Sequence, residues 1–242
     1  MNEFTAGSCV RFGWETFKKR PWFLIGIILL ANVIYGVLST ALGDLQNFGS
    51  ALAFLAFIAS LAVMIVYKMG SVNFQLKAVD DVANLQLKDY WHPYPFWNYV
   101  LVTILIFLCC LLAFIAALVC AGVFGGIAYF IAGGNAGILV FLGALVVFAI
   151  IFVLLVVIRF LFAPYLVIAR GTLAMDAMKQ GAHMTEGNRE KVLLLLVLLA
   201  LVNILGLVCL IVGLLVSIPV SMIAMARAFR ILEQKAGPTP VA

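Results

Sequence analysis

The sequence predicts an all-α fold, a polytopic membrane bundle of six transmembrane helices arranged as three hairpins. The first observation behind this prediction is composition, because 66% of the 242 residues are hydrophobic and 10% are charged. A typical soluble domain has about 25% charged residues. The second observation is that six long apolar stretches separate clusters of basic residues, so all 15 Lys and Arg residues can be placed on one side of a membrane. Since cytoplasmic segments carry the excess of Lys and Arg, we expect a multi-pass membrane protein with both termini in the cytoplasm.

The first predicted hairpin consists of spans at about residues 22–42 and 51–67. Each approaches the roughly 20 apolar residues that a transmembrane helix needs. The connection between them, residues 43–50, has Asp44 as its only charged residue, which suits the outer side of the membrane. The chain returns to basic residues at Lys68, so the second span is expected to end there.

The second predicted hairpin contains a span at about residues 99–121 and a fourth span at about 138–158 or 138–168. The stretch between them, residues 122–137, is uncharged and rich in glycine. We therefore expect this stretch to connect the two spans on the outer side of the membrane.

The third hairpin is predicted because 35 consecutive uncharged residues begin at Val192. A single helix of that length would be about 52 Å long, against a hydrocarbon core of about 30 Å. Basic residues flank the stretch on both sides, so spans at about 192–208 and 211–229 are expected to form a hairpin. The residues expected to shape this hairpin are Gly206, Gly213 and Pro219.

Together the spans form one predicted membrane domain, residues 1–236, followed by a tail at 237–242 that is expected to be disordered. Three cytoplasmic segments place apolar residues three and four positions apart, which is typical of amphipathic helices. These segments are residues 4–18, 69–89 and 171–186. They are expected to lie on the membrane or against the bundle, so the chain is predicted to consist of three units, each an interfacial helix followed by a hairpin.

All four tryptophans are predicted to lie at the cytoplasmic interface, where they would form an aromatic belt. They are Trp14, Trp22, Trp91 and Trp97. The last two belong to a dense aromatic cluster, residues 90–97, which can also be interpreted as a ligand-binding aromatic box. We favour the belt, because the prolines in the cluster suit the end of one helix and the start of the next.

Arg159 is the main candidate for a functional residue, because an ionisable residue inside a membrane usually has a function. If the fourth span stops at residue 158, Arg159 is a boundary residue and Pro164 lies in an interfacial segment. If the span runs to residue 168, Arg159 lies inside the membrane. Its side chain is then interpreted in two ways: it extends to the headgroups, or it pairs with a lipid phosphate or a cytoplasmic-side carboxylate. The candidate carboxylates are Asp80, Asp81 and Asp176.

The sequence predicts no catalytic residues, no metal site and no cofactor. The two histidines lie in different loops, and the five cysteines lack metal-ligand spacing. Because no Asp, Glu, Lys or His lies well inside a span, proton relays are not expected. Asn32 and Asn203 are expected to form hydrogen bonds between helices. The net charge of +5 comes from basic residues beside the spans, which indicates contact with lipid headgroups rather than nucleic acid.

Several short motifs carry a resemblance to known proteins: Gly13-Trp14, Phe162-Ala-Pro-Tyr165, Thr185-Glu-Gly-Asn188, Asn203-Ile-Leu-Gly206, Val212 to Pro219, and Ala228 to Leu232. The chain resembles bacterial six-helix integral membrane proteins of unknown function, which are related to the membrane domain of some glycerophosphodiester phosphodiesterases. The resemblance implies a multi-pass protein of the bacterial cytoplasmic (inner) membrane without an assigned activity. It also implies structural roles for Gly13, Pro164, Gly187 and Asn188. No part of the chain resembles the soluble phosphodiesterase domain, so that activity is not carried over.

These observations predict a non-enzymatic protein that acts through membrane lipids or other membrane proteins, in envelope maintenance or as a subunit of a larger assembly. The alternative is a carrier or flippase for a lipid or a small apolar molecule, with three hairpins around a central cavity. An intramembrane enzyme is the least favoured interpretation.

Overall fold

The computed structural model describes residues 4–45, 49–90 and 95–236, and the elements in these residues are all helices. Six stretches are long and apolar enough to cross a membrane, which confirms the predicted all-α class with six candidate spans. The predicted tail, residues 237–242, and Trp91 lie outside the described residues. The helices are α1 (Ala6–Lys19), α2 (Pro21–Leu45), α3 (Ser50–Asp80), the short η1 (Leu87–Tyr90), α4 (Phe96–Ala132), α5 (Gly134–Phe160), α6 (Ala163–Arg170), α7 (Ala174–Thr185), α8 (Arg189–Val208) and α9 (Leu210–Ala236).

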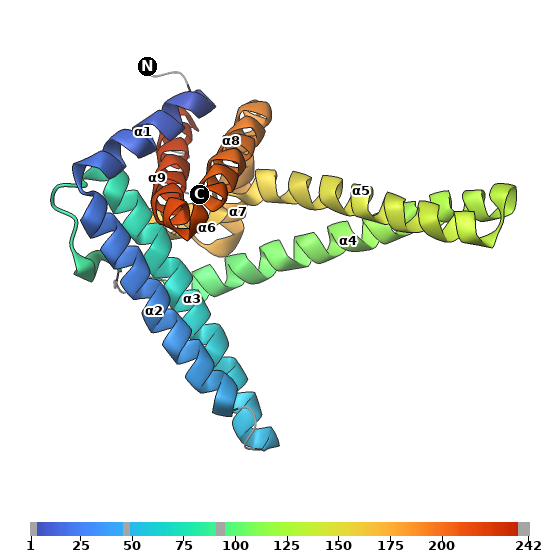
Figure 1. Cartoon of the computed structure of the whole chain (residues 1–242), viewed down its shortest axis with the longest axis horizontal. Coiled ribbons are helices and arrows are strands. Elements are labelled where there is room, and N and C mark those ends of the chain that lie inside the picture. The colour runs from blue at the N-terminus through green and yellow to red at the C-terminus, as the bar shows by residue number, and fades with distance from the viewer. Residues whose placement is uncertain (1–3, 46–48, 91–94, 237–242) are drawn as a thin grey trace.

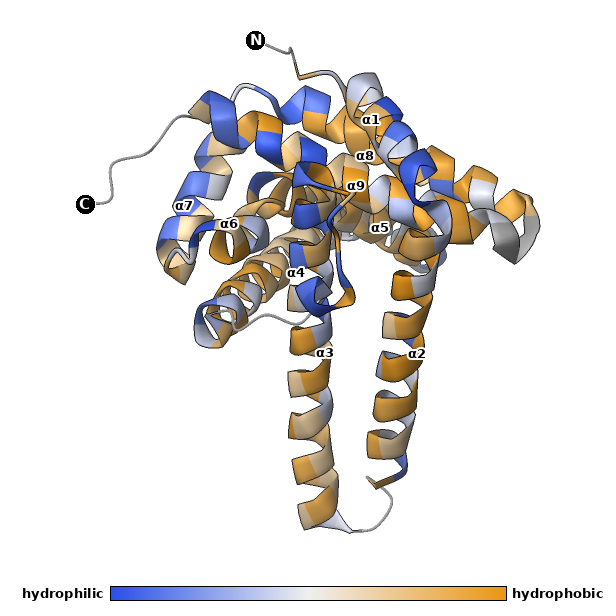
Figure 2. Cartoon of the chain, turned by 90° about the vertical axis from the view of Figure 1, so that its left-hand side faces the viewer, coloured by the Kyte–Doolittle hydropathy of each residue, from blue (hydrophilic) through white to orange (hydrophobic). Residues whose placement is uncertain are grey.

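The molecule has a packed base from which two helix pairs project in different directions (Figure 1). The base consists of α1, α6 and α7 together with residues 69–80 of α3, 192–199 of α8 and 220–236 of α9. One projecting pair is α2 with α3, and the other is α4 with α5. Figure 2 shows that the projecting parts of α2 and α3 consist mainly of hydrophobic residues, whereas hydrophilic residues gather on the base.

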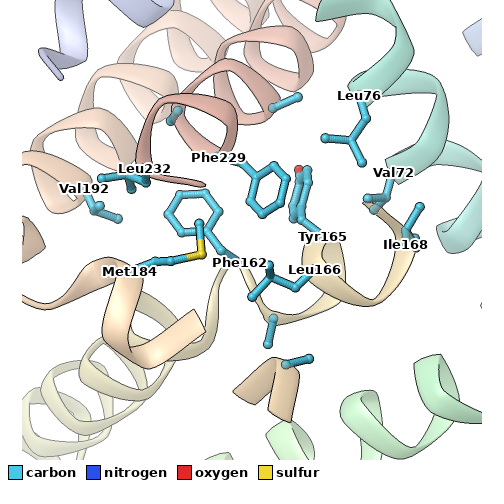
Figure 3. Packing of buried hydrophobic residues seen from close by; sticks show 14 of the residues in the cluster. Val72, Leu76, Phe162, Tyr165, Leu166, Ile168, Met184, Val192, Phe229 and Leu232 are labelled. Carbon is cyan, nitrogen blue, oxygen red and sulfur yellow. The ribbon is translucent and has the colours of Figure 1, made fainter. Parts of the chain in front are cut away.

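The buried core of the protein lies in the base, around the rings of Phe162, Tyr165 and Phe229 (Figure 3). The centroids of the Phe162 and Phe229 rings are 6.0 Å apart, and those of Tyr165 and Phe229 are 5.4 Å apart. Phe130 at the far end of α4 is by contrast 88% exposed. Apolar side chains on the projecting pairs can remain uncovered because lipid tails are as apolar as they are.

A polar chain crosses this core from α6 to α3. The buried Tyr165 hydroxyl donates a hydrogen bond to Oε1 of Gln75 at 2.7 Å, and the Gln75 amide donates to Oγ of Ser71 at 3.1 Å. Each polar group therefore has a partner, which offsets the cost of burying it.

Residues 69–89 do not form the separate helix that the sequence predicts, because residues 69–80 continue α3 without a break and pack against the rest of the base. Residues 69–76 are all buried, so this part of α3 has no face free to lie on a membrane. The sequence pattern of this segment is amphipathic, but neighbouring residues pack against all of its faces, its polar face included. The chain leaves the helix at Asp81 and passes through an irregular segment to η1.

The glycine-rich stretch 122–137 is also not the expected loop, because α4 runs to Ala132 and α5 begins at Gly134. The turn between them is at Gly133, whose φ of +92° favours glycine. Other glycines serve close packing of the two helices. A Cβ added at Gly125 would lie 2.6 Å from Cβ of Phe141, and small residues of this kind allow helices to approach in a membrane.

Glycines also set the packing of α9. A Cβ added at Gly13 of α1 would lie 2.6 Å from the carbonyl oxygen of Val220, next to Pro219 inside α9. Gly206 of α8 and Gly213 of α9 lie in direct backbone contact, and the chain reverses between these helices at Cys209. These positions have no space for a side chain.

The two alternatives for the end of the fourth span lie on either side of a break at Leu161 and Phe162, where α5 ends and α6 begins. Pro164 lies in the first turn of α6, where its missing N–H costs no hydrogen bond. Farther along the chain, Gly187 has a φ of +75° in the turn after α7, and Asn188 is the N-cap residue of α8.

Candidate functional site

Arg159 lies in the last turn of α5, at the edge of the base. Its side chain is exposed and makes no ion pair with any described residue. Its carbonyl oxygen lies 3.3 Å from the Thr185 hydroxyl at the end of α7, which also donates to the carbonyl of Ala182 at 2.9 Å. The guanidinium is therefore available to an anion outside the protein.

The expected pairing of Arg159 with a carboxylate is wrong for Asp80 and Asp81. Asp80 forms an ion pair with Arg230 of α9, whose Nε donates to Oδ1 at 3.1 Å. Asp81 instead accepts hydrogen bonds from the backbone and side chain of Asn84, and these hold the pKa of Asp81 below its ordinary value. The structure brings these carboxylates to the end of α3, which packs against α9 rather than α5. Asp176 is exposed in the first turn of α7, where the helix dipole favours an acidic residue.

The Asp80–Arg230 pair is part of a network that joins three helices. Arg230 Nη1 also donates to Glu233 at 3.0 Å, and Arg170 of α6 donates to the other oxygen of Glu233 at 2.8 Å. Each charge in the network has an opposite partner. The network is thus suited to hold α3, α6 and α9 together.

Three of the predicted interface tryptophans are exposed on or near the base. Trp22 at the start of α2 is 85% exposed and Trp97 at the start of α4 is 74% exposed. Trp14 is exposed on α1, with the Lys18 ammonium 5.1 Å from the centroid of its ring. These positions leave the three indoles free to meet a membrane interface.

A cleft of about 440 Å³ lies between α2 and α3, just beyond the base. Its walls are mainly apolar side chains, four from α2 and three from α3: Leu30, Ala31, Ile34, Leu38, Ala62, Val63 and Val66. Residues 21–43 and 50–67 contain no charged residue, so both walls belong to the apolar part of the helices. The exposed Lys68 directly follows the cleft and marks the change to the polar base.

Several polar groups lie along this cleft. The rings of Tyr35 and Tyr67 stack with centroids 4.7 Å apart, and the Tyr67 hydroxyl donates to Oδ1 of Asn32 at 3.0 Å. The Asn32 amide in turn donates to the carbonyl of Ile28 at 2.7 Å. The bond from Tyr67 to Asn32 joins two spans, as the sequence predicts for Asn32. Asn203 likewise accepts a hydrogen bond from Ser221 of α9 at 3.4 Å.

Leu87 and Tyr90 close the base end of the cleft. The Tyr90 hydroxyl donates to the carbonyl of Tyr67 at 3.4 Å, and burial raises the pKa of Tyr90. The ring of Tyr90 lies against Gly70, where an added Cβ would come within 2.7 Å of it. Gly70 is therefore needed for Tyr90 to reach the cleft.

The segment that carries Leu87 and Tyr90 is fixed from both sides. The guanidinium of Arg20, just before α2, donates to three of its carbonyl groups, those of Val82, Ala83 and Leu85. On the other side, Lys77 donates to the carboxylate of Asp89 at 2.7 Å, and this bond chiefly holds the pKa of Asp89 below its ordinary value. The closed end of the cleft is thus built into the fold.

Sequence reasoning missed this cleft, although one signal was present. Asn32 and Tyr35 lie three residues apart, which places them on the same side of a helix, and both carry polar groups near the middle of a stretch without charged residues. The aromatic cluster at residues 90–97 was assigned to a belt, whereas its first member, Tyr90, lines the cleft. Among the residues that the structure describes, no three Cys, His, Asp or Glu side chains lie close enough together to hold a metal ion.

By its fold, the chain belongs to the class of multi-pass α-helical membrane proteins, with six candidate spans and a polar base. No protein-family model, curated protein or solved structure matches it.

Proposed function

We propose that this is a non-enzymatic protein of the bacterial cytoplasmic membrane, which binds membrane lipids and acts in envelope maintenance or as a subunit of a larger assembly. In this proposal, α2–α3, α4–α5 and α8–α9 are three membrane hairpins, and both termini are cytoplasmic. The base lies at the cytoplasmic surface, with α1 and α7 at the interface. A relation to bacterial six-helix membrane proteins of unknown function, suggested by the sequence motifs, is part of the proposal.

The observation that carries the proposal is the distribution of charge along the six helices. The base ends of five helices carry a Lys or Arg, and the sixth, α4, begins beside the exposed Trp97. No Lys or Arg lies near the opposite ends, at residues 43–50, 122–137 and 205–213. This asymmetry supports a cytoplasmic base whose free cations meet anionic headgroups.

Reporter fusions test the orientation. Fusions at Gly49 and Asn135 are expected to report the periplasmic side, and fusions at Val82, Gly181 and the C-terminus the cytoplasmic side. A periplasmic signal at Gly181 would overturn the proposed threading, because α7 belongs to the base.

Native mass spectrometry of the whole protein, extracted in mild detergent and supplied with phosphatidylglycerol, tests lipid binding. Arg159→Gln is expected to reduce the amount of retained anionic lipid without lowering the melting temperature, because Arg159 is exposed and makes no ion pair with a described residue. Arg11→Gln is the matched control, since Arg11 is exposed but already paired with Glu15 at 2.8 Å. Equal lipid retention by wild type and both variants would count against a headgroup site at Arg159.

The α2–α3 and α4–α5 pairs project from the base in different directions, and this arrangement affects how the protein can insert into a membrane. Both pairs need a hydrocarbon environment, so we propose that they move toward a common direction in the bilayer. Spin labels at Phe54 and Phe130, both exposed, should then lie closer together in nanodiscs than in detergent. An unchanged distance would contradict this part of the proposal.

A carrier or flippase is the second candidate, and the cleft between α2 and α3 is the observation that favours it. The cleft lies within one helix pair rather than at the centre of a bundle, so it supports lipid binding more directly than transport. Movement of fluorescent phospholipid between the leaflets of reconstituted vesicles would favour the carrier if Val63→Trp, which fills the cleft, stopped it.

A further inference from the structure

We infer that the cleft between α2 and α3 holds one acyl chain of a membrane phospholipid, with the ester end of the chain at Tyr35. This inference rests on the proposed function, because it requires α2 and α3 to lie in a bilayer. It adds a defined site and a ligand class to that proposal.

The lining of the cleft fits a hydrocarbon chain. Its walls come from stretches of α2 and α3 that contain no charged residue, and they are mainly branched aliphatic side chains. A volume of about 440 Å³ lies in the range of roughly 300–1,000 Å³ that is usual for small-molecule sites. Water needs several polar partners to occupy a cavity, and these walls offer few.

The cleft is too narrow for a helix from another protein or from a second copy of this chain. A helix with its side chains is about 10–12 Å across, so it would have to separate α2 from α3. The stacked rings of Tyr35 and Tyr67, with centroids 4.7 Å apart, and the hydrogen bond from Tyr67 to Asn32 hold these helices together. A methylene chain can enter without breaking these contacts.

The base end of the cleft orients the chain. Leu87 and Tyr90 block the way toward the base, and the segment that carries them is fixed by Arg20 and Lys77. The Tyr35 hydroxyl makes no hydrogen bond within the described part of the protein, in contrast to those of Tyr67 and Tyr90. It can therefore donate to an ester carbonyl, while the headgroup remains beside the polar base near Lys68.

The test compares two lipids that share a headgroup. The whole protein in mild detergent is titrated with dipalmitoyl phosphatidylglycerol or with its dihexanoyl analogue, and bound lipid is counted by native mass spectrometry. Wild type is expected to retain one long-chain lipid and to retain the short-chain lipid at least about tenfold more weakly. Equal binding of the two lipids would overturn the inference.

Two tryptophan variants provide the structural control. Val63→Trp fills the cleft, whereas Val33→Trp adds the same ring to a residue of α2 that is 60% exposed and does not line the cleft. We expect Val63→Trp to lose the long-chain lipid by at least about tenfold and Val33→Trp to retain it. Equal retention by both variants would also overturn the inference.

A cysteine-protection experiment does not depend on the stability of Val63→Trp. Alkylation of Ala62→Cys, inside the cleft, should slow when the long-chain lipid is added, while alkylation of Leu61→Cys, which is exposed outside it, should not. Equal rates at Ala62→Cys with and without lipid would contradict the site. If lipid retention instead depends on Arg159 but not on chain length, the proposed function stands and the acyl-chain site fails.

Discussion

Arg230 and Asp80 lie 150 positions apart in the sequence, and their side chains form a bidentate ion pair that joins the ends of α9 and α3. Both helices are candidate membrane spans. The pair therefore joins two spans that lie side by side at the base, and Glu233 extends the connection to Arg170 of α6.

Asp80→Asn is expected to destabilise the protein by about 1 kcal/mol or less, because the pair is partly exposed to solvent. Unfolding followed in detergent measures this change. In a double-mutant cycle, Arg230→Gln should cost less in the Asp80→Asn background than in the wild type. Asp81→Asn is the control and is expected to be nearly neutral, since an amide oxygen can still accept the backbone hydrogen bonds from Ala83 and Asn84. Equal losses at the two positions would show that the pair adds nothing specific.

Gly13→Ala is expected to destabilise the protein by about 1–3 kcal/mol, the usual cost of overpacking. The added methyl group would meet the backbone carbonyl of Val220, which cannot rotate away. Gly7→Ala on the same helix has open space around it and is expected to be neutral or slightly stabilising. Melting temperatures of the two variants in one detergent check this difference, and a fall of equal size in both would refute the close contact between α1 and α9.

Tyr165→Phe is expected to cost about 1–3 kcal/mol, because it leaves the buried Gln75 oxygen without its donor. The ring contacts with Phe162 and Phe229 are kept in this variant. Tyr129→Phe is the matched control, since Tyr129 is 57% exposed at the far end of α4. Chemical unfolding of both variants provides the comparison, and an unchanged Tyr165→Phe would mean that Gln75 finds another partner.

Acid should loosen the segment that closes the cleft. Lys77 holds the pKa of Asp89 below the value of about 3.9 that is usual for an unfolded chain. Ionised Asp89 therefore stabilises the fold above about pH 3.9, and this contribution is lost as the pH falls from there through the lowered pKa of the folded state. The melting temperature of wild type should fall more steeply below about pH 4 than that of Asp89→Asn. Parallel curves would exclude this role for Asp89.

The sequence was informative wherever a structure depends on neighbouring residues. Runs of apolar residues predicted six candidate spans, and Asn32 was correctly expected to bond between helices. The glycines between residues 122 and 137 were misinterpreted, because glycine suits both a loop and a close helix contact. At Gly125 the distance to Phe141 of the partner helix decides between the two.

The candidate site could be predicted only in part. An exposed cation at Arg159 and exposed rings at Trp22 and Trp97 follow from their positions beside apolar stretches. The cleft does not, because Tyr90 comes from a segment that follows α3 and folds back along it. No local pattern indicates that fold-back, which depends on Arg20, Gly70 and Asp89 together.

The sequence by itself determined the helical class, the apolar spans and the asymmetry of their charged ends, since hydrophobicity and charge are properties of each segment alone. Tertiary structure decided that Asp80 pairs with Arg230 rather than Arg159, that α3 continues into the core, and that Tyr35, Tyr67 and Tyr90 meet at one cleft. These outcomes depend on how surfaces from distant parts of the chain fit against one another. The fit between two segments cannot be predicted from the sequence of either segment alone.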